Sequence, residues 1–165
     1  TMLFATGEET TVNLIGNGML SLQRNPGAMA RLRKDPGLIG GAVEELLRFE
    51  SPVQMTTRSC TDDLELAGTQ IRAGEEVNLV IGAANRDPAI FAQPGELRLD
   101  RRPNPHLAFG GGIHFCVGPG LARAQACVAI PRLLARFPNL RVQVDNLTWR
   151  RNIVVRGLQH LRAET

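Results

Sequence analysis

The chain contains no tyrosine and a single tryptophan, and it has no apolar run long enough to cross a membrane. A membrane-spanning helix needs about 20 consecutive, predominantly apolar residues, and a secretory leader needs a basic start followed by an apolar segment. Neither pattern occurs in the 165 residues. We therefore expect a cytoplasmic protein without a membrane anchor.

Cysteine and lysine are also scarce. The chain has three cysteines, Cys60, Cys116 and Cys127. Disulfide-rich secreted domains usually have an even number of cysteines that pair with one another, so we expect free thiols in a reducing compartment. Lys34 is the only lysine among the 19 basic residues that give a net charge of +3. Because the arginines are scattered and aromatic residues make up 4% of the chain, this charge does not indicate a nucleic-acid partner.

The hydrophobic pattern predicts a mainly α protein with small antiparallel β-sheets, an α+β class. Helices are expected over residues 1–23, 28–33, 38–49 and 119–137, with a brief one near 89–91. Turn signals at Asp62-Asp63 and Ala73-Gly74 predict short antiparallel strands between residues 53 and 81. Residues 140–144 and 153–158 are expected to form a small terminal sheet. No repeat is visible, and the length suits one domain with its own core.

A glycine-rich loop with one cysteine precedes the last predicted helix, and it reads Phe109-Gly110-Gly111-Gly112-Ile113-His114-Phe115-Cys116-Val117-Gly118. A helix N-terminus offers unsatisfied N–H groups and a partial positive charge, which favour a thiolate. The glycines leave room for a flat ligand against the backbone. Taken alone, the cysteine is also compatible with a small buried hydrophobic residue. His114 and Cys116 have no second pair at zinc-ligand spacing, and Gly110 and Gly112 lack the third glycine of a dinucleotide fingerprint.

Two upstream motifs have ordinary explanations when each is taken alone. Glu45 and Arg48, in Glu45-Leu46-Leu47-Arg48, are three residues apart, so their charges share one helix face and can pair. Alone, they would be an exposed ion pair of little energetic value; the neighbouring Glu44 lacks this spacing. In Thr6-Gly7-Glu8-Glu9-Thr10-Thr11, glycine and threonine disfavour a regular helix ladder. Thr6 and Glu9 also fit a capping box.

Together with Ser51-Pro52-Val53-Gln54-Met55-Thr56-Thr57-Arg58, these motifs resemble those of the cytochrome P450 family, the haem-thiolate monooxygenases, in the family's order. The pattern Phe109-x-x-Gly112-x-x-x-Cys116-x-Gly118 is similar to the family's cysteine loop. Asn85-Arg86-Asp87-Pro88, to which we assign a structural role, and the segment from Pro103 to Gly110 are most similar to soluble bacterial members. Thr6 and Glu8 depart from the alanine and histidine that are usual at these places.

The resemblance implies a role for each motif. Cys116 would be the proximal ligand of the haem iron, and Arg58 and His114 would bind the propionates of haem b. The implied cofactor-binding residues are Arg58, Phe109, Gly110, Gly112, His114, Cys116 and Gly118. Glu45 and Arg48 would be buried and joined by Arg101, with Arg102 as the second choice. Glu9 and Thr10 would deliver protons during oxygen activation, whereas Thr11 is expected to point away from the iron.

The resemblance also implies that residues 1–165 are the C-terminal haem-binding portion of a cytochrome P450 domain. This portion would begin inside the long central helix and lack the N-terminal half. A hydrophobic face would then be exposed, which favours association with another chain or with the missing segment.

Such an enzyme would insert one oxygen atom from O2 into a small organic substrate. No flavin or nicotinamide motif is present, so NAD(P)H would supply electrons through a separate ferredoxin and ferredoxin reductase. The alternative is a catalytically inactive fragment or an assembly module with an incomplete haem site.

Overall fold

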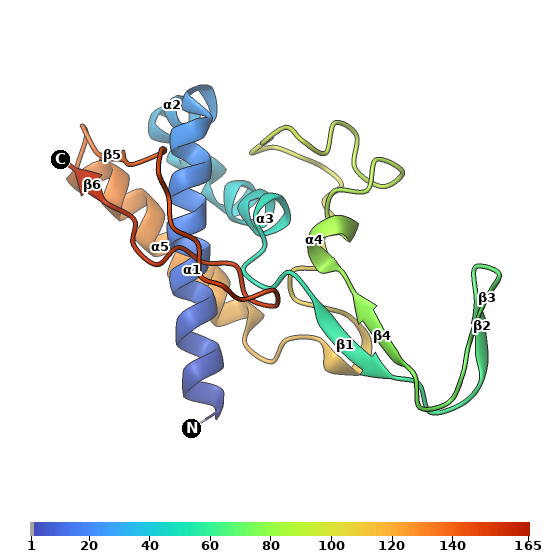
Figure 1. Ribbon diagram of the computed structural model, residues 1–165. Helices are drawn as coiled ribbons and strands as arrows, with labels where there is room; N and C mark the ends of the chain where they lie inside the picture. The colour runs from blue at the N-terminus through green and yellow to red at the C-terminus, as the bar shows by residue number, and fades with distance from the viewer. Residues whose placement is uncertain (1) are drawn as a thin grey trace.

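Three helices form the centre of the protein. The structure is a computed structural model that describes the backbone of residues 2–165 and the side chains of residues 7–165. Helices α1 (Met2–Arg24), α3 (Ile39–Phe49) and α5 (Pro119–Arg136) contact one another in all three pairs. Figure 1 shows α1 running the length of the helical part, with α2 (Pro26–Lys34) and the 3-10 turn η1 (Pro36–Leu38) leading back to α3.

Apolar residues at helical spacing make these helices pack. Ala126, Ile130 and Leu134 of α5 follow one another every four residues and are buried, as expected for one face of a helix. Gly18 lets α1 approach α3 closely, because a Cβ atom at this position would lie 3.1 Å from the Cδ1 atom of Leu46. The core therefore lies where the three helices meet.

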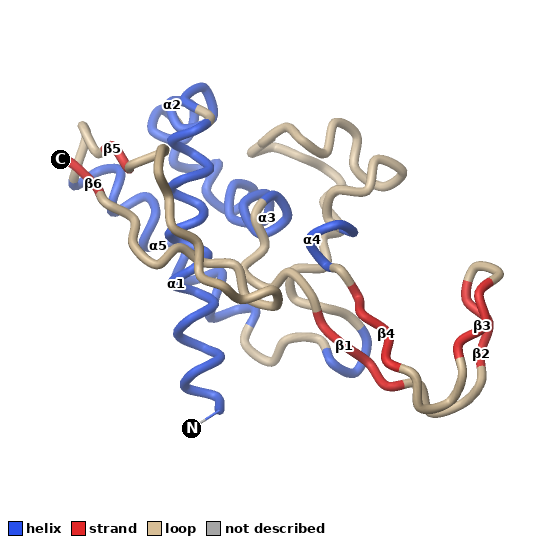
Figure 2. The backbone as a smooth tube through the Cα atoms, viewed as in Figure 1, coloured by secondary structure: helices blue, strands red, loops and turns tan. Residues whose placement is uncertain are grey.

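The strands form three two-stranded antiparallel sheets. Strand β1 (Thr56–Ser59) pairs with β4 (Glu76–Leu79), β2 (Leu64–Leu66) pairs with β3 (Thr69–Ile71), and β5 (Arg141–Val142) pairs with β6 (Ala163–Glu164). Ala67 and Gly68 join β2 to β3 with φ of 49° and 80°, the left-handed pair that a tight hairpin requires. Figure 2 shows the first two sheets as one arm that extends from the helices.

Two predicted elements are wrong. Residues 89–91 form turns instead of a helix, since the Asp87 side chain accepts a hydrogen bond from the Ala89 N–H; the short helix lies earlier, as α4 (Ile81–Ala84). Residues 153–158 contribute only the isolated bridges Val53–Val155 and Trp149–Leu158, because this segment folds back on itself through a bond from Arg150 N to Gly157 O. Strand β5 pairs with β6 in its place.

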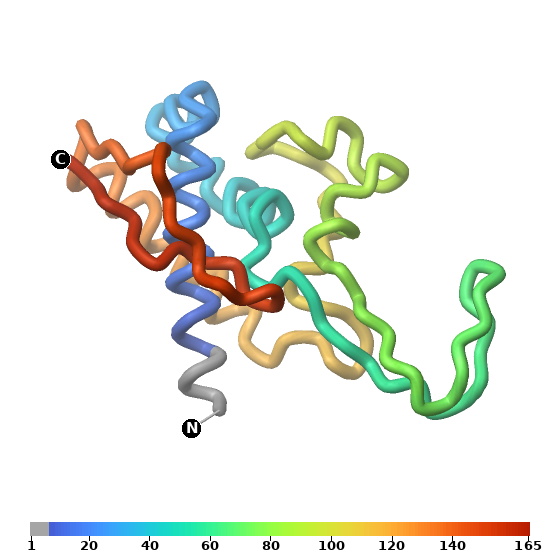
Figure 3. The backbone as a smooth tube through the Cα atoms, in the orientation of Figure 1, coloured from blue at the N-terminus to red at the C-terminus, as the bar shows by residue number. Residues whose placement is uncertain are grey.

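The C-terminal segment lies against α1. Figure 3 shows it crossing that helix, and the Asn17 side chain on α1 donates a hydrogen bond to the Arg156 carbonyl at 2.9 Å. Residues 85–111 form an irregular meander that leads into the 3-10 turn η2 (Gly112–His114) and then α5. Within residues 2–165, no helix is long and apolar enough to cross a membrane.

Candidate functional site

A cavity of about 390 Å³ opens between α1, strand β1 and the loop that precedes α5. Most of its lining is apolar. Seven of the nine residues that were assigned a catalytic or cofactor-binding role line it, although they come from three separate segments: Thr10, Arg58, Phe109, Gly110, His114, Cys116 and Gly118. Glu9 and Gly112 are not among its lining residues.

The cysteine loop turns its thiol toward this cavity and the N-terminus of α5. The Phe109 carbonyl accepts a hydrogen bond from Cys116 N at 2.9 Å, which closes the loop. Gly110 and Gly112 have φ of 73° and 62°, a left-handed conformation that glycine adopts without steric cost. The backbone N–H of Gly118, at the start of α5, donates to Cys116 Sγ at 3.4 Å. Such a donor stabilises negative charge on sulfur.

Positive charge lies near one side of the same cavity. Arg58 projects from β1, and its Nη1 atom donates to Thr56 Oγ1 at 3.0 Å and to the Thr57 carbonyl at 2.8 Å. Among the residues whose side chains the structure describes, its Nε and Nη2 atoms have no hydrogen-bond partner, so they can bind an acidic ligand. His114, at the end of η2, also lines the cavity.

Helix α1 presents two adjacent threonines to the cavity. Thr10 lines it as expected, but Thr11 lines it too and is only 6% exposed, so the expectation that Thr11 points away is wrong. Thr11 Oγ1 donates to the Gly7 carbonyl, four residues earlier, at 3.2 Å; bonds of this kind compete with the regular helix ladder. The Glu9 carboxylate accepts a hydrogen bond from Arg150 Nη1 at 2.8 Å. The Thr6 side chain lies outside the described residues.

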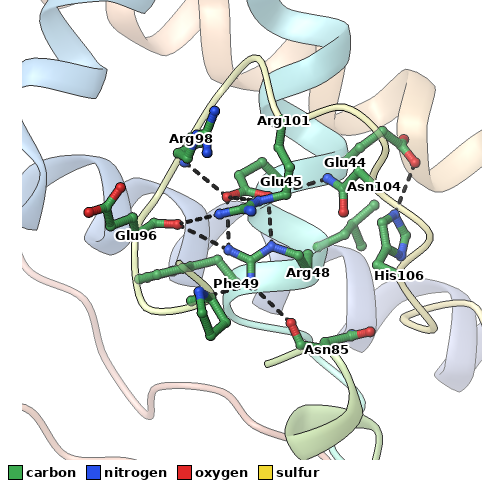
Figure 4. Close-up of polar contacts among 12 residues, drawn as sticks. Glu44, Glu45, Arg48, Phe49, Asn85, Glu96, Arg98, Arg101, Asn104 and His106 are labelled. Carbon is green, nitrogen blue, oxygen red and sulfur yellow. Dashed lines mark hydrogen bonds and ion pairs between the residues drawn. The ribbon is translucent and has the colours of Figure 1, made fainter. Parts of the chain in front are cut away.

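Glu45 and Arg48 form a fully buried pair, with exposures of 0% and 1%. Arg48 donates two parallel bonds to the carboxylate, from Nε at 2.7 Å and from Nη2 at 2.8 Å. Arg101 Nε, and not Arg102, completes the cluster at 3.1 Å from both carboxylate oxygens. Figure 4 shows these three side chains stacked between α3 and the meander.

The remaining donors of both arginines bind meander carbonyls. Arg48 donates to Asn85 O and Pro94 O, and Arg101 donates to Ala92 O and Gln93 O; both donate to Glu96 O. Buried charges are stable only when such partners satisfy them. The cluster therefore holds the irregular chain before the cysteine loop against α3.

Sequence reasoning missed the role of three other side chains. Asn85 is fully buried; its Nδ2 donates to Ser51 Oγ, and its Oδ1 accepts from Leu107 N at 2.7 Å. Asn104 Nδ2 donates to Glu45 at 3.3 Å.

Glu44 binds His106 and Arg123. Burial alone would raise the pKa of Glu44, but hydrogen bonds from Arg123 and His106 outweigh it and lower the pKa from 4.5 to about 2.

The family model for cytochrome P450 matches residues 1–149. The chain belongs to the cytochrome P450 family. This confirms the family expected from the sequence, and the match to solved P450 structures confirms the fold class.

Two of the similar proteins illustrate the relationship, and both are bacterial. The chain is 48% identical to the biotin biosynthesis cytochrome P450 of Bacillus subtilis, over 97% of this chain and 40% of that protein. It is 45% identical to the cytochrome P450 monooxygenase PikC of Streptomyces venezuelae, over 97% of this chain and 39% of that protein. The chain thus spans about 40% of the length of the curated relatives it matches.

Solved structures give the same result. A crystal structure of P450BioI with acyl carrier protein ligated to hexadec-9Z-enoic acid matches with a TM-score of 0.96 and 47% identity, over 99% of this chain and 42% of that one. Ligand-free P450 monooxygenase TamI matches with a TM-score of 0.95 and 46% identity, over 99% of this chain and 41% of that one.

Proposed function

We propose that this chain is the C-terminal, haem-binding portion of a bacterial P450 monooxygenase that oxidises a small organic substrate. The observation that carries the proposal is the single cavity in which Cys116, Arg58, His114 and Thr10 meet. A sulfur ligand at a helix N-terminus, an apolar wall and two basic side chains fit a flat apolar cofactor with acidic groups. Haem b has this chemistry.

Each residue has a distinct task in this proposal. Cys116 holds the iron as a thiolate, and the Gly118 N–H moderates the charge on its sulfur. Arg58 and His114 bind the propionates, the arginine because its planar fork matches a carboxylate. Gly110 and Gly112 let the loop turn at positive φ, and their lack of side chains would leave room for a flat ligand. When bound, the haem supplies the redox chemistry that activates O2 and inserts one oxygen atom into the substrate.

Thr10 and Glu9 supply protons to the cavity. Thr10 lines the cavity from α1. In this proposal its hydroxyl donates the proton, and the adjacent carboxyl group of Glu9 reprotonates it. The carboxylate of Glu9 is bound to Arg150 at 2.8 Å, at a partly exposed position where it can exchange protons with solvent. Proton delivery of this kind requires the carboxylate to leave Arg150 and turn toward Thr10.

The proposed monooxygenase needs an electron source and a substrate. Electrons come from NAD(P)H through a ferredoxin and its reductase in the cytoplasm, and the rest of the P450 domain closes the cavity over the substrate. The structural neighbour P450BioI was crystallised with an acyl carrier protein, so a carrier-bound acyl chain is one substrate to test against free small molecules.

The absorption spectrum of the chain, loaded with haem, reduced and treated with CO, tests the proposal. A strongly red-shifted Soret band, the signature of thiolate ligation, is the expected result. A chain that binds no haem would contradict the proposal and favour a catalytically inactive fragment or an assembly module with an incomplete site.

A further inference from the structure

Arg123 on α5 connects the half-buried carboxylate of Glu44 to the cysteine loop. Its Nε and Nη2 atoms donate to the two oxygens of Glu44 at 2.6 and 2.8 Å. The guanidinium of Arg123 also lies 4.5 Å from the ring centroid of Phe109, within the range of a cation–π contact. Phe109 begins the loop, and its carbonyl accepts the backbone N–H of Cys116.

His106 makes a second connection from Glu44 to the same loop. Its Nδ1 accepts the Ala108 N–H at 3.2 Å, so Nε2 carries the proton and donates to Glu44 Oε2 at 3.0 Å. The side chain is only 3% exposed. The ring centroids of His106 and Phe109 are 6.0 Å apart. The Phe109 ring lies edge-on to the Phe115 ring, with 6.4 Å between their centroids. Glu44 therefore binds both the chain that enters the loop and the helix that leaves it.

The contacts of Glu44 restrict where the Arg123 side chain can lie. An exposed ion pair fixes little, because each long side chain keeps its freedom and the attraction is screened. Here the Glu44 carboxylate has two partners, and Arg123 binds it through two nitrogens. The hydrogen bond to Glu44 is the main reason that the pKa of Arg123 is raised. A fork held at both oxygens leaves the guanidinium one orientation over Phe109.

We propose that Glu44 and Arg123 are positioning residues for Cys116, acting through Phe109 and His106 to fix the cysteine loop in its ligand-binding conformation. The part that concerns haem ligation rests on the proposed function. The part that concerns the loop does not, because the contacts described here are all within the chain.

Backbone amide exchange of the chain without haem tests the loop directly. We expect Glu44→Gln to speed exchange of the amides of residues 107–118 by about tenfold or more, relative to amides of α1 in the same sample. Arg123→Lys should do the same, because lysine keeps the charge but has neither the fork nor the flat face. Asp100→Asn, which removes only the exposed pair with Arg31, should leave this ratio unchanged. Equal acceleration of loop and α1 amides would reduce Glu44 to a general stabiliser and overturn the proposal.

The CO spectrum then tests the connection to Cys116. If the unaltered chain shows the red-shifted band, Glu44→Gln and Arg123→Lys should lower the fraction of protein that shows it, and Asp100→Asn should not. An unchanged fraction in the first two variants would overturn the connection. If the unaltered chain shows no such band, the proposed function fails for this chain, and the exchange ratio alone decides whether Glu44 and Arg123 position the loop.

Discussion

Glu44 and Glu45 are neighbours on α3, but their carboxylates bind different parts of the chain. Glu45 accepts hydrogen bonds from Arg48, Arg101 and the backbone N–H of Arg98, so it holds the meander that precedes the loop. Glu44 binds His106 and Arg123, which lie before and after the cysteine. Helix α3 thereby fixes the loop from two directions through one pair of adjacent residues.

The buried position of Glu45 predicts a large effect on stability. Glu45→Ala would leave two buried arginines without their anion, and removing one partner of a buried pair typically costs about 3–5 kcal/mol. Asp100→Ala removes an exposed pair with Arg31 and should cost about 0–1 kcal/mol. Urea unfolding of both variants measures the difference. Similar midpoints would mean that water reaches the Glu45 cluster; Glu44→Ala is no substitute control, because Glu44 has partners of its own.

Two adjacent glycines of α3 predict effects of opposite sign. A Cβ atom at Gly41 would lie 2.5 Å from the Leu99 carbonyl oxygen, whereas one at Gly40 would meet nothing within 4 Å. Gly40→Ala should therefore stabilise the protein by about 0.5–1 kcal/mol through helix propensity. Gly41→Ala should destabilise it, because α3 and the meander must move apart beside Glu45. Thermal unfolding of the two variants checks the signs, and stabilisation by Gly41→Ala would contradict the close approach.

Short local motifs made much of the site predictable. The spacing of Glu45 and Arg48 allowed an ion pair, and the resemblance to the P450 family implied that this pair is buried and joined by Arg101. The same resemblance, and not the glycines alone, assigned a role to the loop around Cys116. The long helices α1, α3 and α5 were predicted nearly to their ends. Their apolar residues repeat along one face of the helix, and this pattern is visible without knowing which element packs against that face.

The rest depends on partners far away in the sequence. Glu44 and Arg123 are 79 residues apart, and no local pattern distinguishes this glutamate from an exposed one. Residues 153–158 begin with three β-branched residues, which favours a strand, but β5 pairs with β6. Asn85 bridges Ser51 and Leu107, which only the folded chain brings together.

The three cysteines allow the iron ligand to be tested by elimination. Cys116→Ser should abolish the red-shifted band of the reduced, CO-treated protein, since serine oxygen does not replace a thiolate. Cys60→Ser and Cys127→Ser should leave it intact, because neither residue lines the cavity. Burial raises the pKa of Cys127, which makes its thiolate still less available. An unchanged spectrum in Cys116→Ser would disprove the assignment.

The hydroxyl of Thr10 predicts a loss of coupling in the complete P450 domain. Thr10→Ala should leave haem binding and electron uptake intact, while more NAD(P)H is consumed to form hydrogen peroxide instead of oxidised product. Positioned proton donors typically contribute about 10²–10⁴ in rate, so the ratio of product to NAD(P)H should fall clearly.

Thr10→Ser, which keeps a hydroxyl at the same place, is the matched control and should restore most of the coupling. Thr11→Ala is not neutral, because Thr11 lines the cavity and bonds to Gly7 O. Equal coupling in Thr10→Ala and the unaltered enzyme would remove Thr10 from the proton path.

The lowered pKa of Glu44 predicts how stability depends on pH. Its pKa falls from 4.5 in an unfolded chain to about 2 in the folded one, because hydrogen bonds from Arg123 and His106 outweigh the opposing effect of burial. The contribution of the Glu44 charge to stability is therefore fully present above about pH 4.5, and it is lost as the pH falls toward about 2. Glu44→Gln cannot lose it, since glutamine does not titrate. Unfolding midpoints of the two proteins should differ by a constant amount from about pH 7 to about pH 5 and converge below that. A difference that stays constant down to about pH 2.5 would show that the partners of Glu44 do not stabilise its charge.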